Sequence, residues 1–156
     1  MLLSVNYKDF CNYYLIFGDK VKNNIIEKSD FCNIQYSTTT ITLNNIILNF
    51  TLEDVLIDNY YNKYKCIFSK KNIPILKRLI QIEKEILFKY NCSKKGIYKV
   101  EQYLTQNNSI KVFSNKILHV GHYDNAKICL KISGIWENNV EYGLIYKFLI
   151  FDDIHF

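Results

Sequence analysis

Proline, glycine and arginine are scarce in this 156-residue sequence, and the scarcity of proline and glycine argues against flexible linkers and disordered segments. There is one proline, five glycines and a single arginine, Arg78. Linkers and disordered segments are rich in Pro, Gly and Ser, and no stretch of that composition divides the chain. With 49% hydrophobic and 22% charged residues, the composition is that of a folded globular protein. We expect a single domain over residues 1–151.

The cysteines and the lack of long apolar runs indicate a cellular compartment. The five cysteines are odd in number and form no CxxC pair, which fits free thiols in a reducing environment better than a disulfide framework. No run approaches the roughly 20 apolar residues that span a bilayer. Lys8 and Asp9 interrupt the N-terminal apolar stretch too early for a secretion signal. The sequence therefore predicts a cytoplasmic, intracellular protein with no membrane association.

Motifs of catalysis and metal binding are also missing. There is no glycine-rich phosphate loop, no nucleophile elbow and no HExxH helix. His119 and His122, with only Asp124 or Cys129 nearby, are one ligand short of a persuasive metal site. We therefore expect no enzymatic activity, no cofactor and no metal.

The order of secondary structure is the strongest signal that the sequence carries. Ile75, Leu79, Ile82 and Ile86 recur at the helical period and predict one long helix over residues 72–91. Segments rich in β-branched and aromatic residues predict strands. The expected strands are 13–17, 33–36, 40–50, 64–68, 110–113, 117–120, 127–136 and 140–151, and 99–107 is expected to form a short second helix. This order predicts a mainly β fold with one prominent helix, an OB-like five-stranded antiparallel barrel whose helix lies between strands 3 and 4. Other α+β folds share this order and stay open.

The last two strands suggest a binding face. A two-residue turn at Asn138-Asn139 would place Lys131 opposite Tyr146, so that ammonium groups and aromatic rings alternate on one face. Rings stack on bases and lysines neutralise phosphates, which is the chemistry that a nucleic-acid single strand requires. Alternatively, the rings pack against another element, and a longer connection would shift the register and disperse the face. The candidate contacts here are Lys127, Lys131, Trp136, Tyr142 and Tyr146.

A second basic and aromatic segment covers residues 58–72. Tyr61, Tyr64 and Lys65 are its candidate contacts with a phosphate backbone. Since lysine lacks the bidentate fork of arginine, sequence-tolerant binding is favoured over base-specific readout. The alternative is a solvated loop from an AT-rich gene, because Asn, Ile, Lys, Tyr and Phe all have AT-rich codons.

The end of the chain, FDDIHF, resembles the acidic tip of bacterial single-stranded DNA-binding proteins, a run of aspartates followed by Ile-Pro-Phe. Asp152, Asp153, Ile154 and Phe156 match that tip, and His155 replaces the proline. The resemblance implies that residues 152–156 form an acidic tip that docks on replication and repair proteins through Asp152, Asp153 and Phe156. It also implies that the tip competes with DNA for the binding face.

The stretch LKISGIWENNVEYGLIYKF is similar to the terminal hairpin of small single-stranded DNA-binding proteins from AT-rich cytoplasmic DNA elements, such as large DNA viruses and yeast linear plasmids. That likeness implies an OB-like fold that coats replication intermediates. We therefore expect non-catalytic, sequence-tolerant binding of single-stranded DNA. Two alternatives stay open: a protein-interaction or structural component of a virus or plasmid, and an RNA- or duplex-end-binding factor. The oligomeric state, a homo-oligomer included, also stays open.

Overall fold

The structure is a computed structural model that describes residues 3–150. The predicted docking residues Asp152, Asp153 and Phe156 therefore lie outside the described residues. The strands are β1 (Val5–Asn6), β2 (Leu15–Lys22), β3 (Asp30–Ser37), β4 (Thr42–Asn44), β5 (Ile46–Tyr60), β6 (Lys63–Phe68), β7 (Lys95–Ile97), β8 (Ser109–Phe113), β9 (Gly121–Glu137) and β10 (Glu141–Ile150), and the helices are α1 (Ile73–Tyr90) and α2 (Lys99–Gln106).

Five of these strands close into a barrel. β5, β6, β8, β10 and β9 are hydrogen-bonded in that order, and β5 also pairs with β9, which completes the ring. Four of the pairings are antiparallel and one, between β8 and β10, is parallel. The predicted class, mainly β with a five-strand barrel and one prominent helix, is confirmed, and the ring order is compatible with an OB-like barrel.

The predicted place of the helix, between strands 3 and 4, is not confirmed. α1 follows β6 and precedes β8, so it lies between the second and third barrel strands in chain order. The predicted strand over residues 117–120 is a loop. β9 begins earlier than predicted, at Gly121, and runs for 17 residues.

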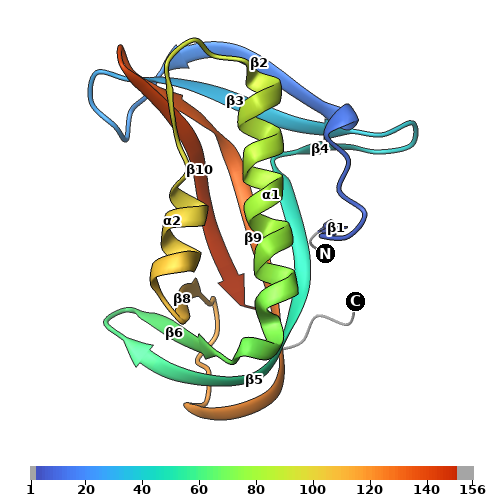
Figure 1. Cartoon of the computed structure of the whole chain (residues 1–156), viewed down its shortest axis with the longest axis vertical. Helices are drawn as coiled ribbons and strands as arrows, with labels where there is room; N and C mark the ends of the chain where they lie inside the picture. The colour runs from blue at the N-terminus through green and yellow to red at the C-terminus, as the bar shows by residue number, and fades with distance from the viewer. Residues whose placement is uncertain (1–2, 151–156) are drawn as a thin grey trace.

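Beyond the barrel, the sheet continues on the far half of β9. Residues 121–132 of β9 pair with β5, and residues 134–137 pair with β3 instead. β2 and β4 then flank β3, while β7 adds to the other edge of β10. In Figure 1, this extension forms the upper half of the molecule, and the barrel strands β5, β6 and β8 form its lower half.

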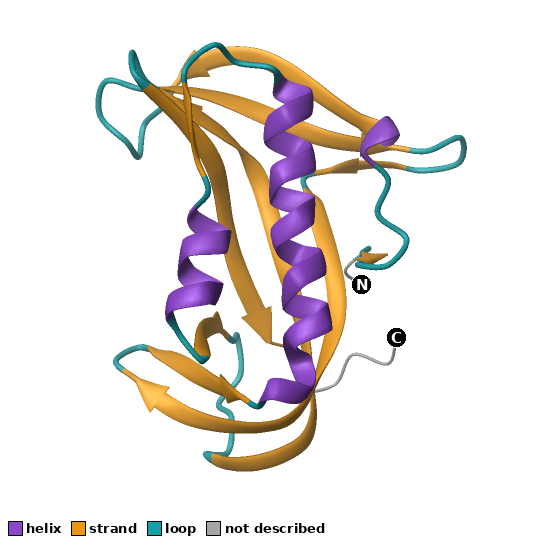
Figure 2. Ribbon diagram, in the orientation of Figure 1, coloured by secondary structure: helices purple, strands orange, loops and turns teal. Residues whose placement is uncertain are grey.

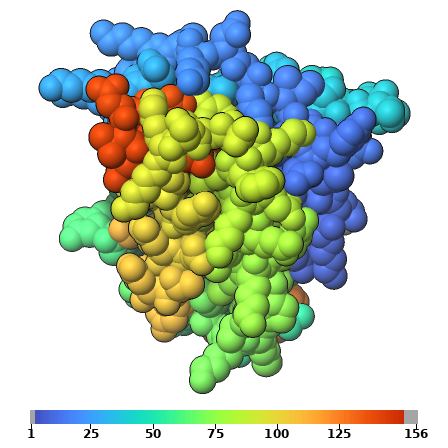
Figure 3. All heavy atoms as spheres, turned by 45° about the horizontal axis from the view of Figure 1, so that its top comes forward, coloured from blue at the N-terminus to red at the C-terminus, as the bar shows by residue number. Residues whose placement is uncertain are grey.

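α1 forms where expected and covers one side of the sheet. Leu79, Ile82, Ile86 and Leu87 are fully buried in the main core, and Leu76 is largely buried there. Figure 2 shows both helices on the same side of the strands, and Figure 3 shows them next to each other at the surface. Asn72, which precedes α1, does not cap it. Its side chain instead exchanges hydrogen bonds with the backbone of Glu53 on β5, at 2.8 and 2.9 Å.

A buried carboxylate on α1 fixes α2. The side chain of Glu83 is 1% exposed and accepts hydrogen bonds from the backbone N–H groups of Val100 and Glu101, both at 2.9 Å. These are unpaired donors of the first turn of α2, so Glu83 acts as a cap supplied from another helix. Burial raises the pKa of Glu83, and the two backbone hydrogen bonds oppose that rise.

A second buried carboxylate, Glu137, joins three segments at the end of β9. It is 5% exposed and accepts hydrogen bonds from Lys94 Nζ at 2.6 Å, Tyr90 Oη at 2.7 Å and Lys20 Nζ at 3.1 Å. Burial alone would raise the pKa of Glu137. The three donors outweigh it and lower that pKa to about 2.

Replacing Glu137 by glutamine is expected to lower the free energy of unfolding by about 2 kcal/mol near neutral pH, because two lysines and a tyrosine lose a charged acceptor. The folded pKa lies below the ordinary 4.5, so the carboxylate stabilises the fold fully above pH 4.5. That contribution is lost as the pH falls toward about 2. Urea denaturation of the parent protein and of the variant should therefore show a difference in the free energy of unfolding that is present near neutral pH and disappears in acid. A difference of the same size near neutral pH and in acid would contradict the prediction.

Candidate nucleic-acid interface

The connection between β9 and β10 is longer than expected, and this changes which residues face each other. Asn138, Asn139 and Val140 all lie outside the strands, and Asn138 Oδ1 accepts hydrogen bonds from the N–H groups of Val140 and Glu141. The register then shifts by one residue between Ile145 and Tyr146. The predicted pairing of Lys131 with Tyr146 is therefore wrong: Tyr146 lies opposite Ile132, and Lys131 lies opposite Lys147.

The new register moves the predicted aromatic contacts of the hairpin away from the predicted lysines. Tyr142 is buried, with its ring centroid 5.8 Å from that of Tyr90 on α1. Tyr146 is half-buried, and burial raises its pKa to about 12. Trp136, also a predicted contact, is buried as well. The expected face of alternating lysine and tyrosine is thus divided between the two sides of the sheet.

The candidate contacts of the second predicted segment, residues 58–72, also point in different directions: Tyr64 faces the core, whereas Tyr61 and Lys65 point away from it. Tyr64 packs against the core, and its hydroxyl oxygen accepts a hydrogen bond from the N–H of Leu118 at 2.9 Å. Tyr61 is 92% exposed at the turn between β5 and β6, with a positive φ of 53°. Lys65 lies on β6 next to the buried Cys66, so its side chain points away from the core.

The structure brings four lysines into one line across the outer face of the barrel. Lys131 on β9 lies opposite Lys147 on β10, and Lys111 on β8 lies opposite Lys65 on β6. Because Phe148 pairs with Val112 in the parallel pair, the preceding residues Lys147 and Lys111 are also neighbours. We call Lys131, Lys147, Lys111 and Lys65 the lysine row. With neighbouring strands about 4.8 Å apart, the row extends for about 15 Å.

Among the described residues, one end of the lysine row has an acidic cross-strand neighbour, because Asp58 on β5 lies directly opposite Lys65. Within residues 3–150, no carboxylate lies at ion-pair distance from Lys111, Lys131 or Lys147. Lysines directly opposite each other on a sheet repel, so each of the two direct pairs costs stability. Lys127 lies on the same face of β9, four residues before Lys131.

Aromatic rings accompany the row. Phe113 on β8 is 38% exposed, and the ammonium groups of Lys63 and Lys147 lie 4.5 and 5.8 Å from its ring centroid. The ammonium of Lys111 lies 4.6 Å from the ring centroid of Tyr60, whose hydroxyl group raises the pKa of Lys111. This face therefore presents positive charge together with exposed ring edges and faces.

Sequence reasoning missed Lys111, Phe113 and Lys147, whereas Lys63 lies in the second predicted segment, residues 58–72, without having been named as a contact. The signal for Lys111 was present: it alternates with Ile110 and Val112, which are both buried. With the expected two-residue turn, Lys147 would lie between Ile145 and Leu149 on the apolar face of the hairpin, and that conflict pointed to a wrong register.

Other kinds of site are less well supported. In the described part of the chain, no three or more His, Cys, Asp and Glu side chains are placed to hold a metal ion. His122 instead bonds Asp54, with 2.5 Å between Nε2 and Oδ1. Among residues 3–150, no helix combines the length and the apolar character needed to cross a membrane.

Comparisons with protein-family models, with curated proteins and with solved structures find no match to this chain, so the candidate site stands on its own geometry.

Proposed function

We propose that the protein binds single-stranded nucleic acid, with DNA as the expected ligand, on the outer barrel face that carries the lysine row. The observation that carries this proposal is the alignment of four lysines from four neighbouring strands, of which Lys111, Lys131 and Lys147 have no carboxylate at ion-pair distance within residues 3–150. A polyanion that follows the row would convert the repulsion between these lysines into attraction and release counterions.

The expected mode of binding is sequence-tolerant. Ammonium groups contact phosphates as point charges, and exposed rings offer stacking surfaces to any base. Phe113 lies beside the row, and Tyr61 protrudes from the turn between β5 and β6. Such a face would cover single strands, including replication intermediates of an AT-rich DNA element, without catalysing a reaction.

The direct test is a fluorescence anisotropy titration with labelled oligo-dT, a duplex of the same length and an RNA oligomer, at several salt concentrations. We expect the single strand to bind best. The logarithm of its affinity should fall with the logarithm of salt concentration at a slope of about −3, since four phosphates contribute roughly −0.7 each. Better binding of RNA would favour the RNA alternative. Binding of the duplex at least as tight as that of the single strand would overturn the proposal.

A second candidate function, association with a protein, is favoured by a different surface. Phe88 on α1 is 85% exposed and Tyr13 is 79% exposed, which is unusual for aromatic side chains. Phe88 also lines a hollow of about 530 Å³, together with Tyr98 and Glu101. If the protein self-associates there, Phe88→Ser should lower the molar mass measured by light scattering. Unchanged mass with intact oligonucleotide binding would remove this candidate.

A further inference from the structure

One edge of β10 is interrupted. Residues 141–143 of β10 pair with β7 and residues 148–149 pair with β8, so residues 144–147 meet neither strand. A hollow of about 410 Å³ opens at this gap. Its lining includes Ile26, Lys99, Trp136, Leu144, Ile145 and Tyr146.

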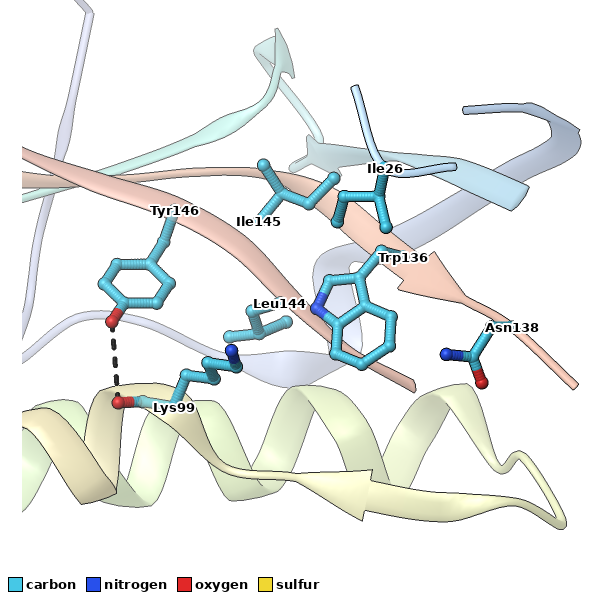
Figure 4. A pocket seen from close by; sticks show the side chains of 7 residues that line it. All are labelled: Ile26, Lys99, Trp136, Asn138, Leu144, Ile145 and Tyr146. Carbon is cyan, nitrogen blue, oxygen red and sulfur yellow. Dashed lines mark hydrogen bonds between the residues drawn. The ribbon is translucent and has the colours of Figure 1, made fainter. Parts of the chain in front are cut away.

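The lining combines two aromatic rings with one positive charge. In Figure 4, the rings of Tyr146 and Trp136 stand on two sides of the hollow, and the side chain of Lys99 lies between them. Leu144 and Ile145 provide apolar surface. Rings and aliphatic groups accommodate a flat apolar ring system, and an ammonium group favours a ligand that also carries a negative charge. A nucleotide has both properties.

Both rings are held in place before any ligand arrives. Trp136 lies opposite Gly143, where an added Cβ would come within 3.0 Å of Trp136 Nε1 and 2.9 Å of the carbonyl oxygen of Ile97. The indole therefore lies directly against the backbone of β10. The hydroxyl of Tyr146 donates to the carbonyl oxygen of Lys99 at 3.5 Å, and its ring packs against Phe148. Fixed walls reduce the entropy lost when a ligand binds.

The hollow is also close to the lysine row. Ile145 and Lys147 are two residues apart on β10 and therefore point to the same side of the strand, about 7 Å from each other. Leu144 and Tyr146 point to the opposite side, so a base of a single strand lying on the row would enter the hollow through the unpaired edge of β10 between β7 and β8, within about one nucleotide step.

We propose that this hollow takes one base of the bound strand, turned out of the stack, with a neighbouring phosphate at Lys99. The role within a strand rests on the proposed function. The chemistry of the hollow, a site for one nucleotide, is testable without the lysine row.

The sequence provides a direct probe, because Trp136 is the only tryptophan. Titration with thymidine 5′-monophosphate, with excitation selective for tryptophan, should quench the emission of Trp136 to a saturating level. Inorganic phosphate and ribose 5-phosphate supply charge without a base, and they should leave the emission unchanged. The same titration with oligo-dT should give a similar final level of quenching at much lower concentration.

Two variants place the quenching in the hollow. Ile26→Phe enlarges a partly exposed lining side chain and should abolish quenching by the mononucleotide. Lys99→Ala should lower the affinity for the mononucleotide about 5-fold, which is the loss expected for one phosphate contact at moderate salt. Lys95→Ala removes an exposed lysine from the adjacent β7 and serves as the matched control, with no change expected.

The two proposals fail in different ways. If oligo-dT binds by anisotropy but neither it nor the mononucleotide changes Trp136 emission, the hollow is not a base site and the proposed function remains. If the mononucleotide quenches Trp136 while oligo-dT binds no better than a duplex, the hollow is a nucleotide site and the proposed function fails. Quenching that persists unchanged in Ile26→Phe would overturn the assignment of the hollow.

Discussion

Replacing Lys131 and Lys147 together by glutamine is expected to weaken oligo-dT binding about 25-fold at about 0.1 M salt, because two phosphate contacts are lost. The slope of affinity against salt should become shallower by about 1.4. The two side chains face each other on β9 and β10, so their removal also relieves a like-charge pair. The variant should therefore be at least as stable as the parent in urea, which separates lost binding from lost folding.

The matched control is the pair Lys22→Gln and Lys77→Gln, which removes the same charge from exposed positions on β2 and α1. It should retain most of the affinity, since neither residue belongs to the lysine row. An equal loss in both double variants would mean that binding follows the net charge of the protein, and the outer barrel face would no longer be identified as the site.

Replacing Gly134 by alanine is expected to lower the free energy of unfolding by about 3 kcal/mol. An added Cβ would lie 2.3 Å from the carbonyl oxygen of Cys32 and within 2.7 Å of two ring atoms of Phe31. Gly134 pairs with Asn33, at the point where β9 passes from β5 to β3. Because the closest atom belongs to the backbone, the strand itself would have to move, and the junction between barrel and extension would loosen. Urea denaturation followed by circular dichroism measures the effect.

Gly18→Ala is the control for this substitution. The nearest atoms to an added Cβ there belong to Asn33, at an ordinary contact distance of 3.6 Å. The change should be neutral or slightly stabilising, since alanine restricts the unfolded chain more than glycine does. If both variants lost the same stability, close approach of strands at Gly134 would not be the cause.

Local features of the fold were predictable where they depend on neighbouring residues. The stripe of Leu79, Ile82 and Ile86 was sufficient to predict α1, and alternation was sufficient to predict most strands. The register of the last hairpin was not predictable, because it depends on a connection that places Tyr142, and not Val140, opposite Glu137, and on a one-residue shift at Tyr146. One added residue exchanges the faces of a strand, which is why Tyr146 and Lys131 were wrongly paired.

The lysine row illustrates a second limit. Its members come from β6, β8, β9 and β10, and the parallel pairing of β8 with β10 brings Lys111 beside Lys147. No spacing along the chain encodes that pairing, because it results from how the barrel closes. The buried Glu83 and Glu137 were unpredictable for the same reason: each looks like an ordinary surface residue until its distant partners are known.

The closure of the barrel also bears on how the chain folds. The pairing of β5 with β9 joins residues 46–57 to residues 121–132, and α1, α2 and the strands β6, β7 and β8 lie between them in the chain. Forming this pairing closes a long loop, and the conformational entropy of the loop is lost before the contacts that compensate for the loss have formed. Local hairpins such as β5–β6 and the helix α1 can therefore form early, while ring closure comes late and sets a folding time on the order of milliseconds to seconds. Until that step, the edges of β5 and β9 remain open to pairing with other chains, and rapid closure limits aggregation.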